Sequence, residues 1–283
     1  MRVFGPSLGL RGLRIHDHTA FIFRGREQLI AHVLDFLGSP EGAQCRLVFS
    51  SSAGVDQMRA ELDPLGDVAG RIARNELVLI NSAILRAPDV DSVGRFICTA
   101  LDAMAQDAVA AGFDGLRVIG DTTPFVLSDH DRVDMAAWEL RCDELVERAP
   151  IALVCAYDEA VIGPGNAVTM ATRHPQSFNL SRDSFHVFFD DGKLALGGEL
   201  DAATVENLET ALSDSPVDGE LSIDMSRVEF IDLAALRVIA DIAATRRDSG
   251  NKLVLRNAPA YMRRLVSVLD LHDPPFTFVD DPD

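Results

Sequence analysis

The sequence contains no uninterrupted apolar run of the roughly 18 residues that a transmembrane helix requires, so no membrane span is expected. The N-terminal stretch MRVFGPSLGLRGLRI has no apolar core that ends in a small-residue cleavage site, which argues against a secretory leader. Cysteine is scarce and no C-x-x-C motif occurs. The cysteines lie far apart inside apolar segments, at Cys45, Cys98, Cys142 and Cys155. We therefore expect buried, reduced thiols and a cytoplasmic protein.

Positive charge is also in short supply. The formal net charge is −18, and the regions before and after residue 180 are both acidic. No basic patch is visible, so a direct nucleic-acid partner and a membrane-surface role are not expected. An acidic surface favours solubility and basic partners, but it does not determine the fold.

Motifs for nucleotide and metal chemistry are missing. An apolar segment runs into Ser50-Ser-Ser-Ala-Gly54-Val, where a phosphate loop would lie, but G-x-x-x-x-G-K-[ST] is absent and no lysine is near. No G-x-G-x-x-G follows any expected strand, which argues against a dinucleotide site. His16-Asp-His18 offers two ligands without a third, so no metal and no other cofactor is expected.

Length and hydropathy favour two domains. The chain has 283 residues, of which 47% are hydrophobic. Apolar strands are expected at 18–23, 45–50, 76–80, 116–120 and 151–157. They alternate with helices at 26–37, 54–62, 67–74, 91–111 and 130–148. This order predicts an α/β domain over residues 1–175 whose mainly parallel sheet is covered by helices on both faces.

The pattern changes after residue 175. The polar stretch 176–183 is expected to be a linker, and residues 184–280 a second domain. Asp190-Asp-Gly192 between two apolar runs predicts a hairpin of strands 185–189 and 194–198. Gly198-Glu-Leu-Asp201 leads into a helix that Asp201 caps, and a strand at 252–256 and a helix from Pro259 follow. We expect a mixed sheet with helices.

The second domain is organised around LSIDMSRVEFIDLAALRVIADIAA, residues 221–244. Leu221 to Asp224 is expected to be a short strand, and Met225 to Ile231 a connector. Asp232 is a suitable N-cap for an apolar-periodic helix that starts behind it. The exposed N-terminus of such a helix attracts negative charge, for example that of a phosphoryl group.

This stretch resembles the signature of the STAS domain, the fold of anti-sigma factor antagonists. Asp224-Met-Ser226 and Asp232-Leu233-Ala234-Ala235-Leu236 stand where the family has Asp-x-Ser and Asp-Ser-x-Gly-Leu. The resemblance implies a loop that contacts a partner, formed by Asp232, Leu233, Ala234 and Ser226. The serine that the family phosphorylates is replaced by Leu233, and Ser226 is a weaker substitute because it precedes the connector.

The first domain resembles the MEDS domain, a bacterial sensory module with a degenerate RecA-like fold. The resemblance covers residues 16–175 and rests on His18…Phe23, Gly42-Ala-Gln-Cys45-Arg-Leu-Val-Phe49, Gly112 to Asp121, Trp138-Glu139, Cys155-Ala-Tyr157-Asp158 and His174-Pro175. It implies the binding of a small molecule, such as a hydrocarbon derivative, by a protein that is not an enzyme.

Ligands of open α/β sheets bind beyond the C-terminal strand ends, which indicates a candidate effector pocket. Its candidate residues are Asp121, Thr122, Tyr157, Trp138 and His18. Structural roles compete with this interpretation. Trp138 shares a helix face with Met135 and Cys142, which favours packing in the core. Asp121 is a favourable residue for capping a turn, and Tyr157 is equally compatible with the core and with the pocket.

Together these features predict a non-enzymatic signalling regulator. A domain that senses an unknown small-molecule effector would control a STAS-like domain that binds a kinase-fold anti-sigma factor, and so sigma-dependent transcription. One alternative is a STAS-mediated scaffold in a larger signalling complex, without a kinase partner. A second is an enzyme hidden in the first domain, for which no catalytic constellation is visible. Homo-oligomer formation is left open.

Overall fold

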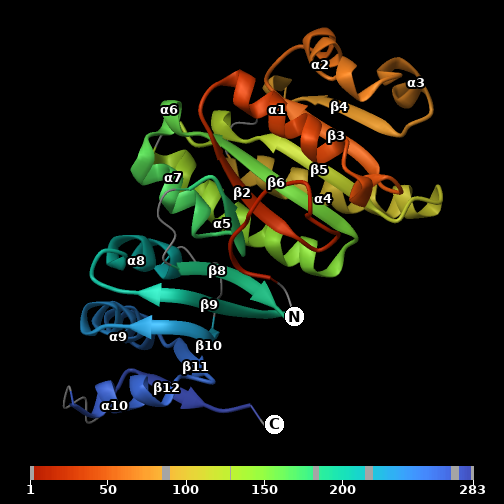
Figure 1. Ribbon diagram of the computed structural model, residues 1–283. Coiled ribbons are helices and arrows are strands. Elements are labelled where there is room, and N and C mark those ends of the chain that lie inside the picture. The colour runs from red at the N-terminus through yellow and green to blue at the C-terminus, as the bar shows by residue number, and fades with distance from the viewer. Residues whose placement is uncertain are drawn as a thin grey trace.

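The computed structural model describes residues 3–84, 90–127, 129–180, 185–213, 219–268 and 274–281. The chain forms two sheets, each with its own helices, and the smaller unit lies beneath the larger one in Figure 1. The N-terminus lies near the boundary between the units, whereas the C-terminus lies at the far end of the second unit (Figure 1).

The first unit is an α/β domain. Its strands are β1 (Gly5–Pro6), β2 (His18–Phe23), β3 (Arg46–Ser51), β4 (Leu77–Asn81), β5 (Leu116–Asp121), β6 (Ile151–Asp158) and β7 (Gln176–Phe178). Its α-helices are α1 (Arg26–Leu37), α2 (Val55–Glu61), α3 (Val68–Ala73), α4 (Val90–Ala110), α5 (Asp129–Arg148), α6 (Glu159–Ile162) and α7 (Pro164–Ala171). Short 3-10 turns at Pro40–Gly42, Asp63–Leu65, Ser82–Ile84 and Thr123–Phe125 connect them.

The seven strands lie in the order β1-β7-β2-β6-β5-β3-β4, and every pairing is parallel. Side chains alternate between the two faces, so β6 directs Cys155 and Tyr157 towards α4, α5 and α7. The same strand directs Val154 and Ala156 towards α1 and α2. The predicted parallel sheet with helices on both faces is confirmed.

The second unit has strands β8 (Phe185–Asp190), β9 (Lys193–Leu200), β10 (Glu220–Ile231), β11 (Lys252–Arg256) and β12 (Phe276–Val279). Its helices are α8 (Val205–Ser213), α9 (Leu233–Asp248) and α10 (Ala260–Val268). The order is β12-β11-β10-β9-β8, with parallel pairs except for the antiparallel hairpin of β8 and β9. This is the mixed sheet expected from the sequence, and the left-handed Asp191 and Gly192 form the predicted hairpin turn.

Three local predictions differ from the structure. The predicted connector from Met225 to Ile231 is part of β10, because two register shifts against β9 break the side-chain alternation while the backbone stays extended. Asp201 does not cap a helix: it accepts a hydrogen bond from the Ala203 N–H in a turn, and α8 starts at Val205. The predicted linker begins with β7, which pairs with β1 and β2, while residues 181–184 lie outside the described residues.

The N-terminal arm is tied to the first domain by Arg117. This side chain on β5 is almost completely buried, and its guanidinium donates to the Phe36 carbonyl and to carbonyls of the arm, those of Leu10, Arg11 and Leu13. Burial lowers the pKa of Arg117 to about 10, although nearby acidic groups oppose the shift. The arm therefore forms part of the fold.

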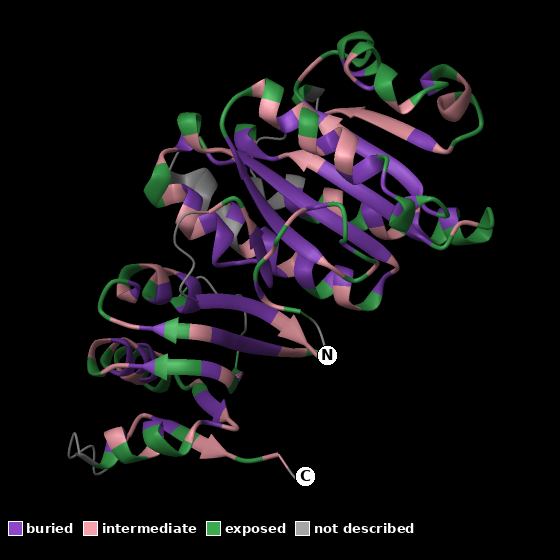
Figure 2. Cartoon of the chain, viewed as in Figure 1, coloured by how far each residue is buried: buried purple, intermediate pink, exposed green. Residues whose placement is uncertain are grey.

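Burial is greatest along the centre of the larger sheet, whereas the outer helices alternate between buried and exposed residues (Figure 2). None of the helices in the described ranges combines the length and the apolar composition that a membrane span needs.

Candidate functional site

A small apolar cavity lies between α4 and the C-terminal parts of β3, β5 and β6. Its volume is about 130 Å³. The lining is mostly aliphatic and aromatic and includes Ala100, Met104, Phe125, Trp138, Asp121, Thr122 and Cys155. A dry apolar cavity of about 150 Å³ is known to bind benzene or xenon, so this one has room for a molecule of only a few heavy atoms.

Three of the predicted pocket residues line this cavity, and two of them have local hydrogen-bond partners, whereas Nε1 of Trp138 has none among the described residues. Thr122 donates its hydroxyl to the Ala156 carbonyl at 2.9 Å, and Asp121 accepts from the Thr123 N–H at 3.2 Å. Burial raises the pKa of the Asp121 carboxyl. The Trp138 ring lies edge-on to Phe125, with 6.2 Å between the centroids. The cavity is therefore suited to an apolar ligand.

His18 does not line the cavity; it belongs to what we call the buried cluster, formed by His18, Glu139, Cys155 and His174, and Tyr157 contacts this cluster. One donor atom of each of the four lies within 4.8 Å of those of the others, and all four residues are buried. His18 starts β2, Cys155 lies on β6, Glu139 on α5, and His174 follows α7. Tyr157 donates its hydroxyl to Oε1 of Glu139.

Strand register brings the cluster together. His18 is paired with Leu153, so Cys155, two residues further along β6, points to the same face of the sheet. The Cys155 Sγ atom lies 3.6 Å from Nε2 of His18, and Oε2 of Glu139 lies 3.4 Å from the same nitrogen. His16 has a different partner, since its Nδ1 is 2.9 Å from the Val146 carbonyl oxygen.

Ionisation within the cluster is strongly perturbed. Burial alone raises the pKa of Glu139, but interactions with His174 and His18 outweigh it and hold the pKa well below its usual range. Burial lowers the pKa of His18, while Asp143 and Glu139 more than offset this effect and raise it. Burial also raises the pKa of the Tyr157 phenol and the Cys155 thiol. A sequence pattern alone does not reveal such a network.

The cluster is connected directly to the second unit. Asp143 on α5 places Oδ1 3.1 Å from Nδ1 of His18, and its Oδ2 accepts from the Phe189 N–H of β8 at 2.6 Å. On the other side, Nδ1 of His186 lies 2.8 Å from the His174 carbonyl oxygen. Leu140 of α5 is buried in the apolar core of the second unit. Helix α5 thus belongs to both cores.

The predicted partner loop lies at the start of α9. Asp232 caps the helix by accepting from the Ala234 and Ala235 N–H groups at 2.8 and 2.9 Å. Leu233 is the first helical residue and is 38% exposed, and Ala234 is half-buried. Ser226 is exposed on β10, before the second register shift, and its N–H donates to Asp224.

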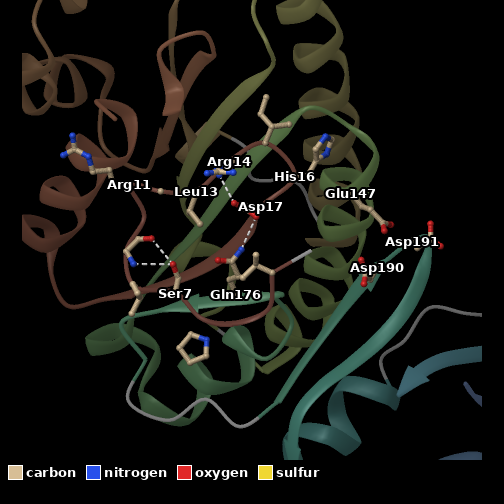
Figure 3. A pocket seen from close by; sticks show the side chains of 16 residues that line it. Ser7, Arg11, Leu13, Arg14, His16, Asp17, Glu147, Gln176, Asp190 and Asp191 are labelled. Atoms are coloured by element: carbon tan, nitrogen blue, oxygen red, sulfur yellow. Dashed lines mark hydrogen bonds between the residues drawn. The ribbon is translucent and has the colours of Figure 1, made fainter. Parts of the chain in front are cut away.

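A larger, open groove lies at the opposite ends of the strands of the first sheet. Figure 3 shows its lining from the N-terminal arm, the start of β7, the end of α5 and the β8–β9 turn, including Arg14, Asp17, Gln176, Glu147 and Asp190. Its volume is about 1260 Å³. Ligands of parallel sheets bind at the C-terminal strand ends, so the apolar cavity is the better candidate for the effector.

The loop after β3 contains no lysine, and Arg26, which donates to Ser51 at the end of β3, is already paired with an acid. Arg26 donates to Ser51 at 2.7 Å and to both carboxylate oxygens of Glu61 at 2.9 and 2.6 Å. Helix α2, which follows the loop, has only 7 residues. This geometry agrees with the missing phosphate-loop motif.

Comparison with known families assigns both units. Residues 17–175 match the family profile described as "MEDS: MEthanogen/methylotroph, DcmR Sensory domain", and residues 188–280 match the one described as "Mlab, STAS domain". None of the curated proteins matches the sequence. The fold and the two matches define a two-domain protein of regulatory type, with a signalling or anti-sigma antagonist-like role. Because the first match spans more than half of the chain, the chain belongs to the MEDS family, and a STAS domain follows its MEDS domain.

The sequence interpretation missed the buried cluster as a site. Glu139, Cys155 and His174 occur in the segments that resemble the MEDS domain, but they were not among the predicted pocket residues; of the cluster itself only His18 was, together with the neighbouring Tyr157. Asp143 was not predicted either. The available signal was weak: His18 and Cys155 stand in apolar strands, but Glu139 and Asp143 stand in a helix with many other charged residues, and His174 follows a helix.

Proposed function

We propose that this protein is a non-enzymatic bacterial signalling regulator in which a small apolar molecule controls the STAS domain from within the MEDS domain. The proposed ligand site is the cavity beside Trp138, Asp121 and Thr122. The proposed output is binding of a kinase-fold anti-sigma factor by the loop around Leu233, which frees a sigma factor for transcription.

The observation that carries the proposal is the double contact of Asp143. One carboxylate joins the buried cluster of the MEDS domain to the backbone of β8, the first strand of the STAS domain. Because Cys155 belongs to the cluster and also lines the cavity, ligand binding there acts on groups that hold the domains together. A ligand shifts the equilibrium between two arrangements of the domains by the difference between its affinities for those arrangements.

We further propose that Leu233 takes the place of the usual phosphoacceptor serine. Its position directly after the capping Asp232 supports this alignment. A leucine cannot accept phosphate, so an anti-sigma kinase does not release this antagonist by phosphorylating it there. The partially exposed side chain instead contributes apolar contact area to the complex.

The alternative is a scaffold in which the STAS domain assembles with other signalling proteins and does not contact a kinase. The test is affinity capture with the full chain from cells of its native species, followed by binding measurements with each purified candidate. Direct binding of a kinase-fold anti-sigma factor supports the proposal, whereas binding only to other STAS proteins supports the scaffold.

The link between the domains is tested by the same binding measurement with Asp143→Asn. The amide keeps the shape of the side chain but offers only one acceptor oxygen for two donors. A control is Glu144→Gln, which changes a neighbouring exposed acid on the same helix. Partner affinity that changes only with Asp143→Asn supports coupling between the domains, and identical affinities for both variants contradict it.

A further inference from the structure

Every outward-facing polar atom of the buried cluster already has a partner. Nδ1 of His174 lies 2.9 Å from the Met170 carbonyl oxygen, and Nδ1 of His18 lies 3.1 Å from a carboxylate oxygen of Asp143. Tyr157 occupies Oε1 of Glu139. Partners of this kind orient metal-binding histidines and carboxylates in proteins and leave their other donor atom free for the ion.

The inward-facing atoms have no partner outside the cluster: Sγ of Cys155 and Nε2 of His18 contact each other, and Nε2 of His174 and Oε2 of Glu139 have no hydrogen-bond partner among the described residues. Since a carbonyl oxygen can only accept, the hydrogen-bond network assigns the proton of the neutral His174 ring to Nδ1 and a lone pair to Nε2. That nitrogen lies 3.2 Å from Oε2 of Glu139, yet neither atom makes a hydrogen bond within the described residues. With a neutral His174, two acceptors at this distance in a dry interior repel each other unless a metal ion lies between them; the alternative is a second proton on His174, which would make the contact an ion pair with Glu139.

Three of the separations between the four atoms fit such a cation, and all four atoms lie within 4.8 Å of one another. In a tetrahedral zinc site with bond lengths of about 2.0–2.3 Å, neighbouring ligand atoms lie about 3.3–3.6 Å apart. Oε2 of Glu139 lies 3.4 Å from Nε2 of His18 and 3.2 Å from Nε2 of His174. Sγ of Cys155 lies 3.6 Å from Nε2 of His18. These nitrogen, oxygen and sulfur donors are those that zinc prefers.

We propose that the buried cluster binds one Zn²⁺ ion in a closed, four-coordinate structural site, through His18 Nε2, His174 Nε2, Glu139 Oε2 and Cys155 Sγ. Cys155 binds as the thiolate, and its proton leaves to solvent when the ion binds. With four protein ligands and no exposed side chain, the ion has no open position for a reactant. The site joins β2, β6, α5 and the segment after α7, and it does not depend on which partner the STAS domain binds.

The first test uses the unaltered full chain, purified without chelators or a metal-affinity tag. Mass spectrometry of the metal content should find one zinc per chain. After removal of the zinc, titration with Co²⁺ should produce the visible bands of tetrahedral cobalt together with a thiolate-to-cobalt charge-transfer band. A chain that contains no zinc and gives neither spectrum after the titration would overturn the proposal.

The second test assigns the ligands. Cys155→Ala should remove the charge-transfer band, whereas Cys45→Ala, at a buried free thiol away from the cluster, should keep it. Glu139→Gln is isosteric and should weaken Zn²⁺ binding by more than the roughly 10–100-fold that loss of an orienting group costs. Asp143→Asn, which changes such a group, should fall within that range.

Thermal unfolding of each variant without metal shows whether it folds. Added Zn²⁺ should raise the unfolding temperature of the unaltered chain and of Cys45→Ala, because an ion that binds only the folded state stabilises it. The same rise in Cys155→Ala and Glu139→Gln, or wild-type cobalt spectra from both, would show that the ion binds elsewhere and that the cluster is a purely hydrogen-bonded network. Neither result bears on anti-sigma binding, so the two proposals fail separately.

Discussion

The ring of Phe4 stacks on the ring of Phe188, with 5.7 Å between the centroids and 16° between the planes. The first residue belongs to the N-terminal arm and the second to β8 of the STAS domain. The guanidinium carbon of Arg227 lies 5.3 and 5.5 Å from the two ring centroids. The arm therefore adds a further connection between the domains, independent of α5.

Phe4→Ala should destabilise the full chain by about 1–2.5 kcal/mol, because it removes an aromatic pair and a cation–π contact. Urea unfolding measures the loss, and Val3→Ala, at a residue that is 65% exposed, is the matched control. A double-mutant cycle sharpens the test. A Cβ atom at Gly197 would lie 2.8 Å from the Phe4 ring, so Gly197→Ala should cost less in the Phe4→Ala background. If the losses of stability caused by Phe4→Ala and Gly197→Ala simply add, Phe4 does not pack against Gly197 and the arm is not held at this position.

Arg117→Met should cost about 3–5 kcal/mol, because it leaves the carbonyls of Leu10, Leu13 and Phe36 buried without their donor. Arg11→Met is the control, since that arginine makes an ion pair at the surface with Asp35. Urea unfolding gives the free energies, and limited proteolysis shows whether the arm is released. A loss below about 1 kcal/mol for Arg117→Met would contradict the proposed anchoring.

Benzene should raise the unfolding temperature of the unaltered chain by binding the cavity beside Trp138. Ala100→Leu places additional methyl groups in this cavity and should abolish the rise. Ala103→Leu makes the same change on the exposed side of α4 and should preserve it. Equal responses of the two variants, or no response of the unaltered chain, would remove the cavity as the effector site.

Calorimetry of the full chain with Mg-ATP should show no binding in the micromolar range. The loop after β3 offers no lysine, and the guanidinium of Arg26 is already paired with Glu61. A phosphate-loop ATPase titrated in the same buffer is the positive control. Micromolar affinity for Mg-ATP would show that the RecA-like sheet has retained a nucleotide site.

If the STAS domain binds an anti-sigma factor as proposed, Leu233→Asp should weaken that binding by up to about 10–100-fold, which corresponds to about 1.5–3 kcal/mol for a fully buried leucine. Tyr261→Asp is the control, because Tyr261 is also 38% exposed but lies on α10. The unaltered chain should keep its mass and affinity after incubation with the partner kinase and ATP. A phosphate gained in the STAS domain together with loss of binding would place the switch at another residue.

The fold could be predicted in outline because its strands are short apolar runs between turn signals. His18–Phe23 was predicted to the residue, and the other strands of the first sheet were placed within one residue, apart from the short β1 and β7. Strand β1 was missed because it has only two residues and depends on its neighbour β7 for hydrogen bonds. The length of β10 was missed because its register shifts break the alternation that identifies a strand.

The residues that line the cavity could be predicted only in part. That the residues of the buried cluster form a site could not be predicted. Asp121 and Thr122 follow a strand, so the general rule for α/β sheets brought them to the correct end. His18, Glu139, Cys155 and His174 meet only through the pairing of β2 with β6 and the packing of α5, and neither is encoded in local sequence. Tyr157 was assigned to the pocket because its strand ends there, whereas its hydroxyl contacts Glu139 of α5.

Helix α5 limits how this protein can be recombined with others. Leu140 is only 3% exposed because the STAS domain covers it, and Glu147 accepts hydrogen bonds from the Gly192 N–H in the β8–β9 turn. A MEDS domain transplanted onto another output domain would expose an apolar residue and leave Asp143 without its second donor. Replacing either domain would therefore require matched changes on α5 and β8.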